Sequence, residues 1–192
     1  MHTIQNNQTR KNVEDKELIQ AILNGQTERY AEVVKAYQED VSNLCYKICG
    51  ARLDIEEITQ QVFVELYYAL PRFQYQAKLR TYIYRITVNV VSKALARGKR
   101  ITPQEDETVF DRKNDEPNVE EAIIRQERLR QLRRCMGLLK PEQRTALALY
   151  TYNDLSYKEI ADVMQITLSK VETLIYRAKQ NIKKMIEKAN AQ

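Results

Sequence analysis

Apolar residues recur at spacings of three and four along most of the chain, and this pattern constrains the fold more than any other feature. The clearest stretch lies between residues 27 and 49, where the apolar positions are Tyr30, Val33, Val34, Tyr37, Val41, Leu44, Cys45 and Ile48. Such spacing is typical of an amphipathic α-helix. Only 4 glycines and 4 prolines interrupt the 192 residues, of which 43% are hydrophobic. The sequence therefore predicts an all-α fold with real hydrophobic cores.

The helical pattern breaks over residues 101–118, which contain two prolines and six acidic against two basic residues. This composition favours a flexible acidic linker. We expect a disordered tail over residues 1–13, a small helical domain over 14–100 and a second small helical domain over 119–192.

Local signals predict where the helices of the first domain begin and end. Asn24 and Gly25 should stop a helix that contains residues 18–23. Asp54, with Glu57 three residues later, should start a helix that Pro71 ends. A further helix is expected over residues 78–97, with one apolar side and a polar side formed by Thr81, Arg85, Asn89 and Lys93.

The second domain should end in a helix-turn-helix unit. A helical block begins near Val119, and Pro141 fits the first position of the next helix. Ser156 and Glu159 form a capping box before a short helix that ends at residues 165–167. A longer helix follows, with Val171, Leu174, Ile175, Ala178 and Ile182 on its buried side. In such a unit the second helix enters the major groove of DNA.

Charge is distributed unevenly between segments. Residues 78–100 hold seven basic residues and no acidic one, which favours contact with nucleic acid over a solvated helix face of mixed sign. Residues 14–65 hold eleven acidic against five basic residues. The negative charge of that segment disfavours DNA binding, and we expect the segment to bind a basic protein.

Several function classes are excluded by what the sequence lacks. Three cysteines and a single histidine, His2, argue against a disulfide framework, a metal site and a histidine base, so Cys45, Cys49 and Cys135 should be core residues. The chain has no glycine-rich phosphate loop, so we expect neither a cofactor nor catalytic residues. No apolar run approaches about 18 residues, and no signal peptide is present, which predicts a cytoplasmic protein without membrane insertion.

Three blocks of sequence resemble the extracytoplasmic-function (ECF) sigma factors, and the likeness covers about residues 14–188. DIEEITQQVFVELY (54–67) resembles the acidic helix that docks on the largest-subunit pair of RNA polymerase. LRTYIYRITVNVVSKALARGKR (79–100) resembles the helix that opens and recognises the minus-ten element, and residues 139–184 resemble the domain that binds the minus-thirty-five element. The resemblance implies an alternative sigma factor that binds core RNA polymerase, opens promoter DNA and starts transcription.

The resemblance also assigns roles to residues. Those expected to bind polymerase are Asp54, Glu56, Glu57, Gln60, Gln61 and Phe63. Those expected to bind the minus-ten element, partly as melted strands, are Lys78, Thr81, Tyr82, Tyr84, Arg85, Asn89, Lys93, Arg97 and Arg100. Those expected to bind the double-stranded minus-thirty-five element are Ser156, Tyr157, Ser169, Lys170, Glu172, Thr173, Tyr176 and Arg177. Cations, aromatic rings and an amide suit the capture of melted DNA, and Asn89 matches the base-recognising position.

Three departures from the family pattern concern DNA contact. Tyr82 stands where the family usually has Trp, which reduces the stacking surface, and Gln165 stands where a helix-turn-helix often has Gly. Glu172 and Leu174 occupy positions that are often basic in the family. We therefore expect weak or unusual minus-thirty-five recognition, with dependence on another recruiting partner.

Two rival functions remain open on sequence alone. A stand-alone helix-turn-helix regulator would leave the blocks at 54–67 and 79–100 unexplained, and a sigma-like adaptor would not need Asn89. The resemblance further implies an anti-sigma factor as a partner and a linker that threads near the polymerase active site. The acidic residues of the linker would serve equally well to keep a tether soluble.

Overall fold

All regular secondary structure in the described part of the chain is helical. The computed structural model describes residues 15–50, 53–97 and 119–190, apart from the side chains of 119–125 and 190. Within these ranges no residue lies in a β-strand, and the prediction of an all-α fold is confirmed. The expected tail over 1–13, the linker over 101–118 and Arg100 lie outside the described residues.

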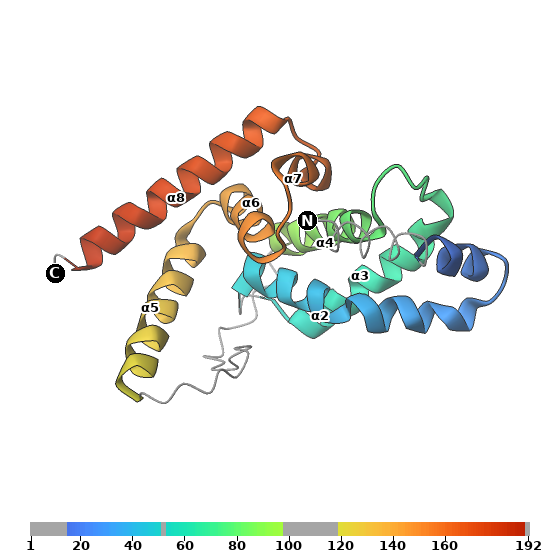
Figure 1. Cartoon of the computed structure of the whole chain (residues 1–192), viewed down its shortest axis with the longest axis horizontal. Helices are drawn as coiled ribbons and strands as arrows, with labels where there is room; N and C mark the ends of the chain where they lie inside the picture. Colours follow the sequence, from blue (N-terminus) through green and yellow to red (C-terminus); the bar gives the residue numbers. More distant parts are fainter. Residues whose placement is uncertain (1–14, 51–52, 98–118, 191–192) are drawn as a thin grey trace, which may run out of the picture.

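The N-terminal half is a bundle around three long helices (Figure 1). Residues 15–23 are helical and lead into η1 (Thr27–Arg29) and α2 (Tyr30–Cys49). The bundle continues with α3 (Ile55–Ala69), η3 (Leu70–Arg72) and α4 (Leu79–Ala96), and α2, α3 and α4 pack against one another. The side chains most completely buried between them include Tyr37, Val41, Leu44, Leu66 and Ile83.

Helix boundaries follow the local signals. The Asp54 carboxylate accepts a hydrogen bond from the backbone N–H of Glu57 at 3.0 Å, which caps α3. Gly25 has a φ of 105°, a left-handed conformation that glycine adopts without steric cost, and the first helix ends just before it. These predicted boundaries are confirmed, although Pro71 lies inside the short helix η3 that extends α3.

The C-terminal half consists of α5 (Val119–Leu138), α6 (Pro141–Tyr152), α7 (Tyr157–Met164) and α8 (Leu168–Asn190). Pro141 is in the first turn of α6, as its missing N–H favours. Helices α6, α7 and α8 pack against one another, and α7 with α8 forms the helix-turn-helix. Val171, Ile175 and Ala178 face this core, as predicted.

The turn of the helix-turn-helix is tight despite the absence of glycine. The Ser156 hydroxyl accepts from the Glu159 N–H, and the Glu159 carboxylate accepts from the Ser156 N–H, which completes the predicted capping box. At the other end of α7, Gln165 takes the left-handed conformation with φ 55° and ψ 46°. Its N–H and that of Ile166 both donate to the carbonyl of Ala161. Gln165 therefore makes the turn that glycine would make, at a conformational cost.

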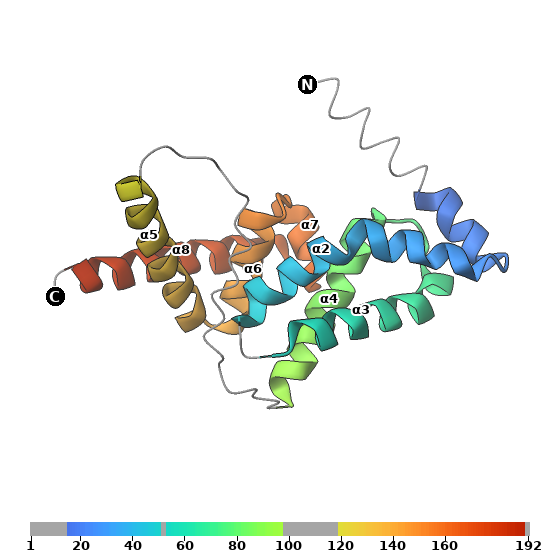
Figure 2. The same ribbon diagram turned by 90° about the horizontal axis from the view of Figure 1, so that it is seen from below.

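The two halves pack directly against each other, which the sequence did not predict. Helix α6 lies against α2, and α7 lies against α4 (Figures 1 and 2). Arg144 of α6 is only 4% exposed, and its guanidinium donates to the Ile48 carbonyl at the end of α2 at 2.8 Å. It also donates to the carbonyls of Gly137 and Leu139. The buried apolar residues of both halves consequently form one continuous cluster.

Replacing Gln165 by Gly should stabilise the protein. Glycine removes the side-chain clash of the left-handed conformation, so we expect Gln165→Gly to raise the free energy of unfolding by about 1 kcal/mol in urea titrations. The matched control Glu172→Gly puts glycine inside α8 and should lower it by about 1 kcal/mol. Equal destabilisation by both variants would contradict the strain assigned to Gln165.

Candidate nucleic-acid and polymerase interfaces

Helix α4 is covered on most sides, because α2, α3 and α7 all pack on it. Asn89, Lys93 and Arg97 remain exposed and follow one another at intervals of four residues. The Lys93 ammonium lies 3.7 Å from the Glu65 carboxylate of α3, an exposed pair of little energetic weight. We call Asn89, Lys93 and Arg97 the polar strip of α4. It offers an amide and two cations to solvent.

An aromatic cluster lies at the other end of α4. The rings of Tyr75 and Tyr82 each lie 4.8 Å from the ring of Phe73, measured between centroids. The Arg85 guanidinium sits 5.0 Å from the Tyr82 centroid, in cation–π geometry, and the Tyr82 hydroxyl donates to the Ala69 carbonyl. These contacts hold Tyr82 and Arg85 in one orientation.

A pocket of about 500 Å³ opens beside this cluster. Its walls come from the connector before α4, from α4 itself and from α7, and the lining residues are Arg72, Phe73, Gln74, Gln76, Ala77, Thr81, Tyr82, Arg85 and Asp162. Aromatic surface, amides and guanidinium groups thus meet in one concave site. The sequence predicted Thr81, Tyr82 and Arg85 but missed Gln74 and Gln76, because nothing in the connector indicated that it folds back on α4.

Two residues predicted on the DNA-facing side of α4 are instead buried. Tyr84 is 0% exposed, and its hydroxyl binds Asp40 of α2, Arg80 of α4 and Asn153 at the end of α6. Thr81 is buried where α7 and the connector meet α4. The expectation that Tyr84 offers its ring to unstacked bases is wrong for this arrangement, because packing by two other helices covers it.

Helix α3 presents an acidic, amide-rich side to solvent. Asp54, Glu56, Glu57, Gln60 and Gln61 are all exposed, as their predicted contact with a protein requires. Gln60 donates to the Glu56 carboxylate at 3.4 Å.

Phe63 does not belong to this side of α3. It is 7% exposed and lies in the core, while its carbonyl accepts from the Tyr30 hydroxyl. Its predicted place on the polymerase-facing surface is therefore wrong, because the helical period turns position 63 inward. Val64 and Tyr68 are exposed instead and continue the side of Gln60 and Gln61 at helical spacing. The same period, applied past Gln61, would have found them.

The predicted minus-thirty-five residues lie in α7, in α8 and just before α7. Ser169, Lys170, Glu172, Thr173, Tyr176 and Arg177 are exposed on α8, and the Tyr176 side chain is 66% exposed.

Several of these side chains already have partners in the protein. The Lys170 ammonium pairs with Glu142 at 3.1 Å, and the Thr173 hydroxyl donates to the Ser169 carbonyl. Tyr157 is half-buried and packs edge-on against Tyr150. Exposed Leu168, at the start of α8, was not predicted as a surface residue.

Leu174 is 8% exposed and faces the core. Its predicted burial is confirmed, and it is not an altered DNA contact. Glu172 alone remains as an acidic side chain where the family often has a basic one.

The cysteines lie in the interior of the described part of the chain. The three cysteines are buried, as predicted, and burial raises the pKa of the Cys45 thiol to about 12. Within the described ranges no group of three or more His, Cys, Asp or Glu side chains is placed to hold a metal ion. None of the helices in those ranges combines the length and apolarity needed to cross a membrane.

Two family patterns match the chain. Sigma-70 region 2 matches residues 33–101, and Sigma-70 region 4 matches residues 129–182. The region 2 match covers most of α2 and all of α3 and α4 with the polar strip, and the region 4 match covers the second half of α5, all of α6 and α7 and the larger part of α8. A stand-alone helix-turn-helix regulator would not be expected to contain sigma-70 region 2.

Curated relatives cover nearly the whole chain. The RNA polymerase sigma-H factor of Pseudomonas aeruginosa is 28% identical over 183 residues, which span 91% of this chain and 94% of the relative. The ECF sigma factor SigW of Bacillus subtilis is 24% identical, with 89% and 96% covered. The ECF sigma-E factor of Escherichia coli K12 is 26% identical, with 90% and 94% covered.

Solved structures share the fold. CnrH, in complex with the cytosolic domain of CnrY, superposes with a TM-score of 0.64 at 19% identity and covers 90% of this chain and 97% of its own. RpoE of Bartonella quintana, in complex with the anti-sigma factor NepR, superposes with a TM-score of 0.62 at 13% identity and covers 82% and 96%. With both sigma-70 regions present in order, the chain belongs to the ECF sigma factors, non-enzymatic proteins that direct RNA polymerase to promoters and start transcription.

Proposed function

We propose that this sigma factor captures the melted minus-ten element along α4, with Asn89 recognising a base. The observation that carries the proposal is the polar strip of Asn89, Lys93 and Arg97 on the helix that also bounds the aromatic pocket. Unstacked bases need aromatic surface, phosphates need cations, and a base edge needs an amide. Tyr82 supplies the stacking surface, and Arg85, held over its ring, supplies a cation.

Removal of the Asn89 amide tests this role. A bidentate amide–base contact contributes about 1–3 kcal/mol, so Asn89→Ala should slow initiation about 5- to 150-fold while binding of core polymerase is retained. Run-off transcription and co-purification with core polymerase measure the two quantities. The control Gln38→Ala removes an exposed amide from α2 and should leave both unchanged. Normal initiation by Asn89→Ala would refute the proposed role.

The acidic side of α3 is the proposed polymerase-docking surface. It consists of Asp54, Glu56, Glu57, Gln60 and Gln61, extended by Val64 and Tyr68. Complementary charge steers encounter with a basic surface of the largest-subunit pair. The exposed apolar side chains add apolar surface that is buried on binding.

Reversing one charge on this surface should weaken docking. We expect Glu56→Lys to lower the affinity for core polymerase several-fold, chiefly through a slower association rate that depends less on salt. Glu39→Lys, the same change at an exposed position of α2, is the control. Surface-binding kinetics at two salt concentrations give both rates, and equal effects of the two variants would contradict this assignment.

Minus-thirty-five recognition by α8 is proposed to be weak, with another partner helping to recruit the factor. Glu172 is exposed near the start of the helix that enters the major groove, where a carboxylate repels phosphate. Lys170, the neighbouring cation, is paired with Glu142. The exposed Arg177 and Tyr176, further along α8, are among the predicted contacts that remain.

Replacing the repelling carboxylate tests this weakness. Glu172→Lys should raise the affinity for promoter duplex and steepen its logarithmic salt dependence by about one unit, which corresponds to one further phosphate contact. Glu187→Lys makes the same charge change far along α8 and should do neither. Tight, sequence-specific and salt-sensitive duplex binding by the unaltered protein would overturn the proposal.

Regulation by an anti-sigma factor is also proposed. The solved structures of CnrH and of the Bartonella quintana RpoE contain CnrY and the anti-sigma factor NepR, respectively, and both share the fold of this chain. We further propose that residues 14–100 and 119–192 act as two domains joined by 101–118, and that the protein works in the cytoplasm, where polymerase and promoter meet.

A further inference from the structure

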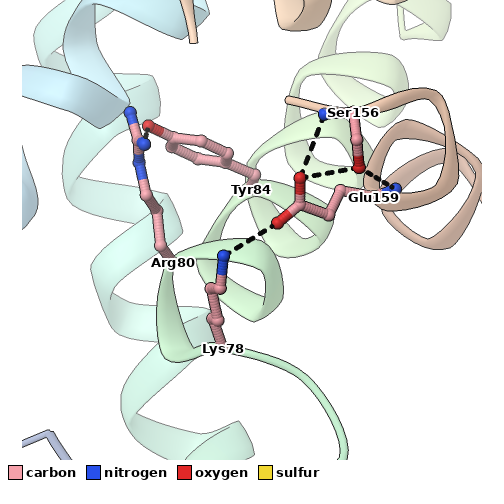
Figure 3. A network of polar contacts seen from close by, with 5 residues as sticks. All are labelled: Lys78, Arg80, Tyr84, Ser156 and Glu159. Atoms are coloured by element: carbon pink, nitrogen blue, oxygen red, sulfur yellow. Dashed lines mark hydrogen bonds and ion pairs between the residues drawn. The ribbon is translucent and has the colours of Figure 1, made fainter. Parts of the chain in front are cut away.

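Helix α7 packs against α4, and its Glu159 carboxylate points toward Lys78 at the start of α4 (Figure 3). The Glu159 carboxylate pairs with the Lys78 ammonium at 3.1 Å, across 81 positions of sequence. Asp162, one turn further along α7, lines the same pocket as Arg72 and Arg85. Two acidic side chains of the C-terminal half thus lie among cations of the minus-ten surface.

The Glu159 carboxylate is adapted to this position. Partial burial opposes its ionisation, but hydrogen bonds from Ser156 and Lys78 outweigh burial and lower its pKa below the ordinary value. The side chain is therefore an anion at neutral pH and faces Lys78 as a phosphate group would.

Buried polar contacts hold the two halves together behind this pair. Asn153 is 5% exposed, and its amide donates to the Tyr84 hydroxyl at 2.9 Å. Burial raises the pKa of Tyr84 to about 12, so the hydroxyl stays protonated and donates a hydrogen bond to the Asp40 carboxylate. Arg144 makes the second buried contact, with the Ile48 carbonyl. We call this packing of α6 and α7 on α2 and α4 the closed arrangement.

The closed arrangement cannot engage both elements of a promoter at once. The minus-ten and minus-thirty-five elements are centred about 25 base pairs apart, which is about 85 Å of duplex at 3.4 Å per base pair. Helix α7 belongs to the unit that would bind one element, yet Glu159 touches Lys78 on the surface for the other. The halves must therefore separate before initiation.

We propose that α7 is a built-in competitor of promoter DNA, whose Glu159 and Asp162 carboxylates occupy phosphate positions on the minus-ten surface of the free protein. This inference rests on the proposed function of α4. Ion pairs that are partly exposed are weak, so polymerase and DNA together displace α7. The free protein is thereby kept from binding single strands on its own.

Neutralising both carboxylates without changing their shape tests the competition. Glu159→Gln preserves the capping box, since Gln serves as well as Glu at that position, and Asp162→Asn alters an exposed side chain. We expect the double variant to bind a fluorescent 12-nucleotide single strand of mixed sequence at least about fivefold more tightly than the control pair Glu17→Gln with Glu187→Gln. Both pairs remove two exposed or part-exposed negative charges, so general electrostatics are matched.

Energy transfer between dyes on Glu39 of α2 and Lys183 of α8 reports the closed arrangement directly. The dyes are attached through introduced unnatural amino acids, which leaves the buried cysteines intact. Transfer should be high in the free full-length protein, lower in the double variant and lower still on core polymerase. Asn153→Ala, which removes a buried contact without a charge change, should also lower transfer and raise single-strand affinity.

Three results would overturn the proposal. These are equal single-strand affinity of the double variant and the control pair, transfer in the free protein as low as on polymerase, and unchanged transfer in both Asn153→Ala and the double variant. Failure of the proposed function is distinguishable, because it would appear as normal initiation by Asn89→Ala on polymerase, whatever the transfer in the free protein.

Discussion

The hydroxyl of Tyr84 is the contact on which the relation between the two halves depends. It accepts from Arg80 and Asn153 and donates to Asp40, so one oxygen joins α2, α4 and the end of α6. A buried hydroxyl with all its partners stabilises one arrangement, whereas loss of a partner leaves a costly polar group. Because this packing covers much of α4, its polar strip and the pocket at its other end are the parts proposed to meet DNA.

Most of the fold could be predicted from the sequence, because its signals are local. The capping box of Ser156 and Glu159, the position of Pro141 and the apolar period of α2 each specify a helix within a few residues of chain. The polar strip of α4 was predictable for the same reason, since Asn89 and Lys93 share one face of a single helix.

What could not be predicted depends on contacts between distant segments. Tyr84 and Thr81 are polar residues with a plausible exposed side, and contacts from α2, α7 and the end of α6 bury them. Arg144 carries a charge that normally favours solvent, yet it is buried, because backbone carbonyls of two segments accept hydrogen bonds from its guanidinium. Phe63 is a different case, because attention to the helical period would have placed it in the core.

Helix α7 is only eight residues long and packs against α4 on one side and α8 on the other. Its sequence is therefore under two selections at once, one for the geometry of the helix-turn-helix and one for contact with α4. A substitution that improves one of them alters the other, so changes in α7 should be tolerated only together with compensating changes in α4 or α8. If each promoter element is recognised by a different half of the chain, as proposed, promoter preference at the two elements would then evolve jointly.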